Sequence, residues 1–217
     1  MTRPMKLYNF FRSGTSHRLR IALNLKRLAY EYVAVDLRSE RHLALDFKAV
    51  NPQGLVPALV LDDGRVLTQS PAILEWLEER HPQPPLLPLD AEDRARVRAL
   101  AAIVANDIHP INNRRVLEYL RRQIGLDDAA VNAWCTTWVE AGFDAFDALL
   151  ATDSGRGDFC FGESPTLADV ALIPQIESAR RFKIDIRRWP RLEAIDKTCS
   201  GIDAFSRATP ACQPDSA

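Results

Sequence analysis

The stretch Arg12-Ser-Gly-Thr-Ser-His-Arg-Leu-Arg-Ile-Ala-Leu23 decides the fold. It follows a short apolar segment at residues 6–10 that is typical of a strand, and it merges into an amphipathic pattern at residues 18–26 that predicts a helix. Alternating apolar residues at 32–37 predict a second strand. Because a strand–helix–strand crossover is right-handed, we expect these two strands to be parallel.

A hairpin and a helix are predicted further along the same part of the chain. Residues 58–67 contain two apolar runs around Asp62-Asp-Gly64, which is a hairpin signal. Ser70-Pro71 then predicts a helix that ends near residue 80, with Ser70 as the N-cap and Pro71 at the first helical position. These segments together predict an α/β domain.

Residues 82–88 separate this domain from the rest of the chain. Four of the seven residues are proline, which cannot continue a helix and favours an extended linker. The helices predicted beyond it are residues 90–107, 114–124 and 127–150, and one after the capping signal Thr166-Leu-Ala-Asp169. We therefore expect an α/β domain over residues 1–81, a linker over 82–88 and an all-α domain over 89–217.

The composition of the 217-residue chain is that of a globular protein, with 47% apolar and 26% charged residues. A net charge of −1 argues against nucleic acid as a partner, because phosphate binding needs a positive excess. No apolar run is long enough for a membrane span, and no secretory signal is recognisable. The four cysteines form no CxxC pair and no metal-ligand spacing, so we expect free thiols, no metal and a reducing, cytoplasmic setting.

The loop Arg12-Ser-Gly-Thr-Ser-His17 is the first candidate binding site. It immediately precedes a predicted helix, where backbone N–H groups are unpaired and the helix dipole is positive. Small hydroxyl residues there suit a phosphate, a carboxylate or a thiolate, although Ser16 could also simply cap the helix. No Gly-Lys-Ser/Thr follows, which excludes the Walker phosphate-binding pattern.

Four other segments carry features that have both a functional and a simpler interpretation. Val56-Pro57 stands at the start of a strand, where proline is often unremarkable. N–H groups near Gln69-Ser70 suit a ligand carboxylate, unless Ser70 only caps the helix. Residues 108–115 form a polar cluster inside the predicted bundle, and Arg180-Arg181 is a pair of adjacent arginines; solvated surface is the simpler explanation of both.

The order of these segments resembles the soluble glutathione transferases, whose N-terminal domain has the thioredoxin-like fold. Arg12–Leu23 is similar to the zeta-class signature, and so to the maleylacetoacetate isomerases. Ser13-Gly14-Thr15 together with Asn112-Asn-Arg-Arg115 brings the chain closer to the maleylpyruvate isomerases of bacterial aromatic catabolism. The zeta class usually has Ser-Ser-Cys in the loop, so any role of that cysteine passes to Thr15 here or is lost.

The resemblance implies glutathione as the cofactor and gives these segments roles. A cis-Pro57 after Val56 presents backbone to the cysteinyl part of glutathione, and His42 contacts its glycyl end. Some contacts in this family cross a dimer interface, which leads us to expect a homodimer. The implied glutathione contacts are Ser13, Gly14, Thr15, His42, Val56, Pro57, Gln69, Ser70, His109, Asn113, Arg114 and Arg115.

The implied reaction is cis–trans isomerisation of maleylpyruvate, maleylacetoacetate or both, by reversible addition of the glutathione thiolate to the alkene. Ser13 or Thr15 is expected to donate a hydrogen bond to that thiolate, and the sequence does not rank them. The substrate is a small dicarboxylate, and the candidate binding groups are Arg12, Arg114 or Arg115, and Arg180 or Arg181. Among these, the resemblance points to Arg12 and Arg181. A general conjugating transferase or peroxidase, and a non-catalytic binding module, are the competing hypotheses.

Overall fold

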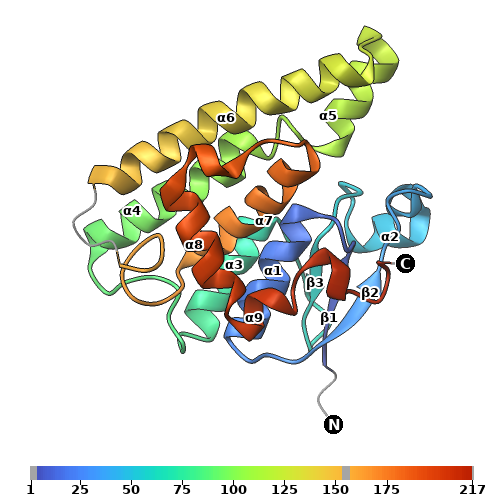
Figure 1. Cartoon of the computed structure of the whole chain (residues 1–217). Coiled ribbons are helices and arrows are strands. Elements are labelled where there is room, and N and C mark those ends of the chain that lie inside the picture. The colour runs from blue at the N-terminus through green and yellow to red at the C-terminus, as the bar shows by residue number, and fades with distance from the viewer. Residues whose placement is uncertain (1–3, 153–156, 217) are drawn as a thin grey trace. The chain divides into compact units, whose positions relative to one another are not determined.

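The chain forms two compact units in a computed structural model that describes residues 4–152 and 157–216 (Figure 1). The first unit takes the chain through Pro85 and adds the segment from Ser200 onward, and the second is Leu86–Cys199. The compact units thus divide the chain differently from the expected domain bounds, since the segment from Ser200 onward groups with the first unit. The α/β and all-α character of the two parts is confirmed, as expected for a thioredoxin-like domain followed by a helical one.

Four strands among the described residues form one sheet in the first unit, in the order β2–β1–β3–β4. The strands are β1 (Met5–Asn9), β2 (Tyr30–Ala34), β3 (Ala58–Val60) and β4 (Val66–Thr68). β1 pairs with β2 in parallel, as the crossover rule predicts. β3 is antiparallel to both β1 and β4, which confirms the hairpin expected around Asp62–Gly64.

The helices α1 (Gly14–Leu25) and α3 (Ser70–Arg80) pack side by side in the first unit, whereas α2 (Leu45–Val50) lies apart from them (Figure 1). A short 3₁₀ turn, η1 (Arg41–Leu43), precedes α2. Neither α2 nor η1 was expected, because a helix of one or two turns is too short to show a periodic pattern. α3 also begins one residue earlier than predicted, so Gln69 and not Ser70 is its N-cap.

The C-terminal segment returns to the first unit through α9 (Asp203–Ser206) and the turn η5 (Pro210–Cys212). Asn24 Nδ2 donates to the Ala204 carbonyl at 3.0 Å. The carboxylate of Asp215 accepts from the Tyr32 hydroxyl and, at 3.2 Å, from the Phe11 N–H. These contacts join residues far apart in the sequence, which is why helical periodicity alone assigned the segment to the second domain.

Arg20 is the central group of this attachment. It is fully buried, and its Nε donates to the Ala208 carbonyl at 2.9 Å. Its other nitrogens donate to Asn9 Oδ1 at 3.0 Å and to the Phe11 carbonyl at 2.9 Å. One guanidinium therefore fixes both the end of β1 and the C-terminal segment, since a guanidinium offers five donors in a rigid fork.

Replacing Arg20 by methionine is expected to lower the free energy of unfolding by about 3 kcal/mol, because several buried oxygens lose their donor at once. Urea unfolding followed by circular dichroism measures the change. Arg65→Met is the matched control, since Arg65 is exposed and, among the residues that the structure describes, its side chain pairs with Asp63 alone, at 2.7 Å. That variant is expected to stay within about 0.5 kcal/mol of the parent, and equal losses in the two variants would contradict the role given to Arg20.

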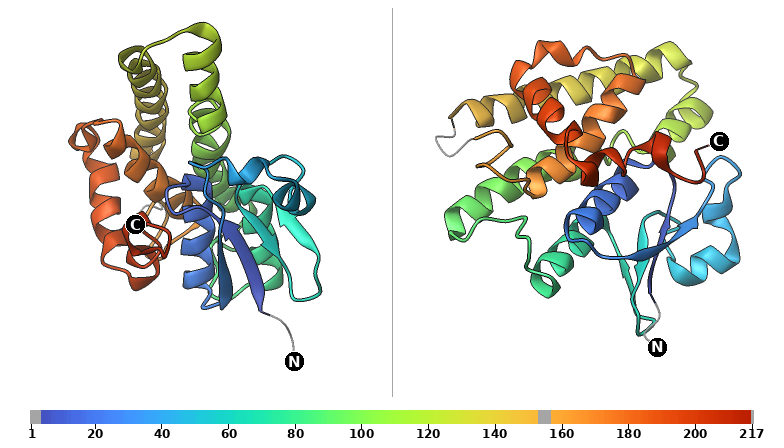
Figure 2. Two further views of the ribbon diagram at one scale, coloured as in Figure 1. Left: turned by 90° about the vertical axis from the view of Figure 1, so that its right-hand side faces the viewer. Right: turned by 60° about the horizontal axis from the view of Figure 1, so that its bottom comes forward.

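The second unit is helical. Its helices are α4 (Ala91–Ala102), α5 (Arg114–Tyr119), α6 (Asp128–Thr152), α7 (Leu167–Arg181) and α8 (Pro190–Ser200), with the π-helical segments η2 (Ile103–Ile108) and η3 (Leu120–Ile124) and the 3₁₀ turn η4 (Ile186–Arg188). α6 runs along η2 and η3 (Figure 2). A Cβ on Gly142 would lie 2.3 Å from the Ile108 side chain, so a larger residue there would displace the buried Ile108. The capping box predicted at Thr166 and Asp169 is confirmed.

The proline-rich stretch at 82–88 is held at several points and is not a free linker. The buried Lys26 Nζ forms an ion pair with Glu78 at 2.8 Å and donates to the Pro84 carbonyl at 3.0 Å. Leu86 and Leu87 are each only 2% exposed, and the division between the units falls immediately before them. Among the described helices, none combines the length and the apolar character that a membrane crossing needs.

Candidate active site

The loop between β1 and α1 is built to stabilise an anion. Ser13 is the N-cap of α1, and its Oγ accepts from the Ser16 N–H at 3.3 Å. In the part of the chain that the structure describes, the N–H groups of Gly14 and Thr15 have no hydrogen-bond acceptor. Two unpaired N–H groups at the positive end of a 12-residue helix attract negative charge.

Two hydroxyl groups stand beside these N–H groups. Ser13 Oγ and Thr15 Oγ1 lie 2.9 Å apart, and Thr15 Oγ1 donates to the Val56 carbonyl at 3.0 Å. Because a hydroxyl has one hydrogen and that of Thr15 is used on Val56, Ser13 is the donor within the pair. The bond between Thr15 and Val56 joins the two segments that the sequence singled out separately, the loop before α1 and the Val-Pro step.

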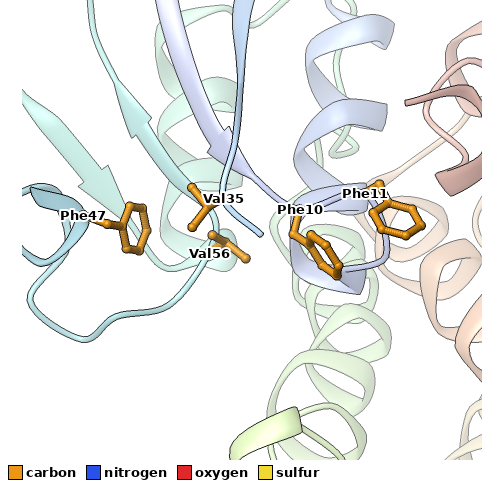
Figure 3. Packing of buried hydrophobic residues seen from close by; sticks show 5 residues of the cluster. All are labelled: Phe10, Phe11, Val35, Phe47 and Val56. Atoms are coloured by element: carbon orange, nitrogen blue, oxygen red, sulfur yellow. The ribbon is translucent and has the colours of Figure 1, made fainter. Parts of the chain in front are cut away.

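A buried apolar cluster packs around Val56, next to the bond between Thr15 and the Val56 carbonyl. Its buried members are Phe10, Phe11, Val35, Phe47 and Val56. Figure 3 shows Val35 and Val56 between Phe47 on one side and the pair Phe10 and Phe11 on the other. The peptide bond between Val56 and Pro57 is cis, as the resemblance implied.

The loop before Pro57 is ordered by its own polar groups. The buried Asn51 donates from Nδ2 to the Leu55 carbonyl at 2.7 Å, and its Oδ1 accepts from the Gln53 N–H at 3.1 Å. A Cβ on Gly54 would lie 3.0 Å from the His42 carbonyl oxygen, and Gly54 has a φ of +62°. Glycine at this position lets η1, which carries His42, approach the loop of the cis proline.

Gln69 and Ser70 form the turn into α3. Gln69 has φ 67° and ψ 109°, an unfavourable conformation for a residue with a side chain, and its Nε2 donates to Gln53 Oε1 at 2.7 Å. Ser70 is buried as the first residue of α3, and its Oγ accepts from Arg18 Nη1 at 3.4 Å. Arg18 carries no role in the sequence interpretation, although two arginines among the apolar residues of one helix are a visible signal.

The second unit holds the other expected contact residues. His109, Asn113, Arg114 and Arg115 all lie on the turn from η2 into α5 or at the start of α5. Asn113 is the N-cap of α5, with Oδ1 accepting from the Arg115 N–H at 3.2 Å. Arg114 Nε pairs with Glu118 at 2.5 Å on the same helix. The structure thus gathers these residues on one segment. Arg114 and Asn113 already have hydrogen-bond partners on that same segment.

The same turn contains a buried amide that sequence reasoning missed. Neither Oδ1 nor Nδ2 of Asn112 has a hydrogen-bond partner among the described residues, although both atoms are enclosed. The neighbouring backbone is fixed, since Trp134 Nε1 donates to the Ile111 carbonyl at 3.1 Å. No sequence signal separates Asn112 from Asn113, because burial depends on how the turn packs.

The adjacent arginines at the end of α7 have different partners. Arg180 Nη2 forms an ion pair with Asp196 Oδ2 at 2.5 Å. Arg181 Nη2 donates to Ser178 Oγ at 2.9 Å. Arg180 therefore has a carboxylate partner on the following helix. Arg12, another candidate for binding a substrate carboxylate, is exposed at the start of the loop before α1.

Three of the protein's four thiols are poorly suited to act as nucleophiles. Cys135, Cys160 and Cys199 are buried, and burial raises the pKa of each, to about 11 for Cys135. Such thiols remain protonated at neutral pH, whereas the thiolate is the reactive form. Cys212 is exposed.

The fold and the anion-binding loop define a known class of protein. The N-terminal domain of glutathione S-transferases matches residues 12–80, and their C-terminal domain matches residues 128–195. The chain belongs to the glutathione S-transferase family, which confirms the resemblance inferred from the segment before α1. Glutathione is the cofactor of this family.

Particular members of the family are similar over nearly the whole chain. The maleylpyruvate isomerase of a Ralstonia species is 66% identical over 214 residues, which covers 98% of this chain and 100% of that one. A holo structure of a zeta-class maleylpyruvate isomerase has a TM-score of 0.95 at 65% identity, with 98% and 100% of the two chains covered. The maleylacetoacetate isomerase of Methylobacterium extorquens, solved with malonate and glutathione, has a TM-score of 0.93 at 40% identity, with 96% and 98% covered.

Proposed function

We propose that this protein is a glutathione-dependent cis–trans isomerase of maleylpyruvate, with maleylacetoacetate as a possible second substrate. The observation that carries the proposal is the full-length 66% identity to a maleylpyruvate isomerase. The loop before α1 agrees with it, because it stabilises an anion with hydroxyl and N–H groups and contains no thiol of its own. A role in aromatic catabolism belongs to the same proposal.

Glutathione, when bound, supplies a thiolate that adds reversibly to the cis alkene, so that the resulting single bond rotates before the thiolate leaves. The protein must keep that thiol ionised. An unperturbed thiol with a pKa of about 8.5 is only about 3% ionised at pH 7. Lowering the pKa by about two units needs about 2.7 kcal/mol, which one charge-assisted hydrogen bond and a helix N-terminus together can supply.

Ser13 is the better candidate for the hydrogen bond to the thiolate. Thr15 donates its hydroxyl hydrogen to the Val56 carbonyl, and that hydrogen bond holds the loop against the segment of the cis proline. The hydroxyl hydrogen of Ser13 is donated to Thr15 Oγ1. When glutathione is bound, its thiolate can accept this hydrogen in place of Thr15. Ser13 then remains oriented, because its Oγ still accepts from the Ser16 N–H as the cap of α1. Thr15 accordingly acts as a support for Ser13.

The remaining parts of glutathione fit the other segments of the first unit. Backbone at Val56 and Pro57 suits the cysteinyl part, and His42 suits the glycyl end. Gln69 and Ser70, at the N-terminus of α3, suit the γ-glutamyl carboxylate. Further contacts proposed from the second unit are His109, Asn113, Arg114 and Arg115.

Arg12 and Arg181 are proposed to bind the two carboxylates of the substrate and to stabilise the negative charge that develops between them. Guanidinium groups suit this role because they bind carboxylates in a planar, bidentate way. The presence of malonate, a small dicarboxylate, in the Methylobacterium extorquens structure supports a dicarboxylate site in this family.

A homodimer and a reducing, cytoplasmic compartment complete the proposal. The dimer follows from the family contacts that cross a subunit interface. The compartment is supported by cysteines that are free in the described residues, since disulfides are rare in reducing compartments.

Counting free thiol during turnover tests the reaction. Maleylpyruvate is added to the protein with a small amount of glutathione, the loss of substrate absorbance is followed, and thiol is titrated at intervals. An isomerase returns each glutathione, so we expect complete conversion of a large substrate excess with constant thiol. A fall in thiol matching the loss of substrate would instead show the competing conjugation activity. Substrate loss at the same rate without glutathione would contradict both.

A further inference from the structure

Arg18 is a buried charge that the proposed reaction does not yet use. It lies on α1 and is 2% exposed. Its hydrogen bond in the structure is the one from Nη1 to Ser70 Oγ, and its Nε is enclosed without a partner among the described residues. Burial lowers the pKa of Arg18 to about 10, so the guanidinium still carries its charge at neutral pH.

The other buried cations of α1 and its C-cap are compensated. Arg20 donates to several carbonyl and amide oxygens, and Lys26 pairs with Glu78 at 2.8 Å. Arg18 forms no ion pair with any described residue. A buried, uncompensated guanidinium carries a large desolvation penalty, which an anion from outside the chain would remove.

Ser70 links Arg18 to the N-terminus of α3, because it begins that helix and accepts a hydrogen bond from Arg18. Its Oγ accepts from Arg18, so its own hydrogen is left to donate, and the described part of the chain offers that hydrogen no acceptor. Ser70 is also the first residue of an 11-residue helix, where N–H groups and the dipole favour an anion. Guanidinium, hydroxyl and helix end therefore converge on one position.

We propose that Arg18 is a positioning residue for the γ-glutamyl carboxylate of glutathione, acting through Ser70. By donating to Ser70 Oγ, the guanidinium directs the serine hydroxyl hydrogen toward the carboxylate and supplies the buried positive charge that balances it. This inference rests on the proposed placement of that carboxylate at Gln69 and Ser70.

The test compares two ligands on each variant by calorimetry. One ligand is glutathione, and the other is its analogue with a 4-aminobutyryl group in place of the γ-glutamyl residue, which lacks only the α-carboxylate. We expect Arg18→Gln to weaken glutathione binding about tenfold or more while changing the analogue's Kd less than about twofold. Arg27→Gln, at an exposed arginine just beyond α1, is the matched control and is expected to change neither Kd.

Equal weakening of both ligands by Arg18→Gln would show that Arg18 only supports the fold, and this outcome overturns the proposal. If Arg18→Gln does not fold, Arg18→Lys is the variant to test. It keeps the positive charge but replaces the planar guanidinium that donates to Ser70 Oγ. The preference for glutathione over the analogue is then expected to fall at least about threefold, and an unchanged preference overturns the proposal. If the parent protein binds glutathione and the 4-aminobutyryl analogue equally well, the proposed site for the γ-glutamyl carboxylate is wrong. If it binds neither ligand, the proposed function is wrong.

Discussion

Replacing Ser13 by alanine is expected to lower isomerase turnover by about 10²-fold at pH 7. The variant loses the hydroxyl that we assign to the thiolate, and removing one such donor from a preorganised site typically costs this much. Removing a donor to the charged form raises the pKa of the bound thiol, so the rising limb of the pH–rate profile moves to higher pH. The loss in turnover is therefore expected to shrink as the pH is raised toward 9.

Thiolate absorbance of the glutathione complex, titrated against pH, measures this pKa directly. Thr15→Val removes the neighbouring hydroxyl, which we assign to the Val56 carbonyl and not to the thiolate. We therefore expect it to raise the thiol pKa less than Ser13→Ala does. Ser39→Ala, at an exposed serine of the same unit, is the control and should leave the titration unchanged. A larger pKa change in Thr15→Val than in Ser13→Ala would reverse the roles of the two hydroxyl groups.

Replacing Arg181 by alanine is expected to reduce kcat/KM for maleylpyruvate by about 10²-fold and to change the Kd of glutathione by less than about twofold. The guanidinium is proposed to hold a carboxylate of the substrate and not the cofactor. Steady-state kinetics and calorimetry on the same preparation separate the two effects.

Arg180→Ala provides a demanding control for this prediction. It removes the same side chain from the neighbouring position, but Arg180 is paired with Asp196. We expect its kcat/KM to stay within a few-fold of the parent, in line with other surface substitutions. If turnover in Arg181→Ala stays within a few-fold of the parent, the proposal that Arg12 and Arg181 bind the substrate carboxylates is wrong.

The parts of the fold that the sequence predicted well depend on contacts between near neighbours. The parallel strand pair, the hairpin around Asp62–Gly64 and the capping box at Thr166 all follow from local patterns of apolar, turn and capping residues. The short helix α2 and the return of the C-terminal segment did not emerge from such patterns. The segment is held by single polar contacts, such as Asp215 to the Phe11 N–H, which have no periodicity to detect.

The candidate site shows the same division. Apart from His42, which only the resemblance assigned, the residues proposed for it lie on segments that the sequence had marked. The signature spanning Arg12–Leu23, the Val-Pro step and the Gln-Ser pair are contiguous motifs. The rank of Ser13 over Thr15 came from the Val56 carbonyl, and the carboxylate that pairs with Arg180 is that of Asp196. Neither partner can be read from the motif, since each lies outside it.

Residue order alone determined the family, the two-part organisation and the anion-binding character of the loop before the first helix, since motifs and helix ends act over a few residues. Tertiary structure decided which hydroxyl group keeps a transferable hydrogen and, among the described residues, which buried guanidinium keeps an N–H without an acceptor. Those two properties depend on which oxygen atoms folding brings within about 3 Å, a distance that separation along the chain does not encode.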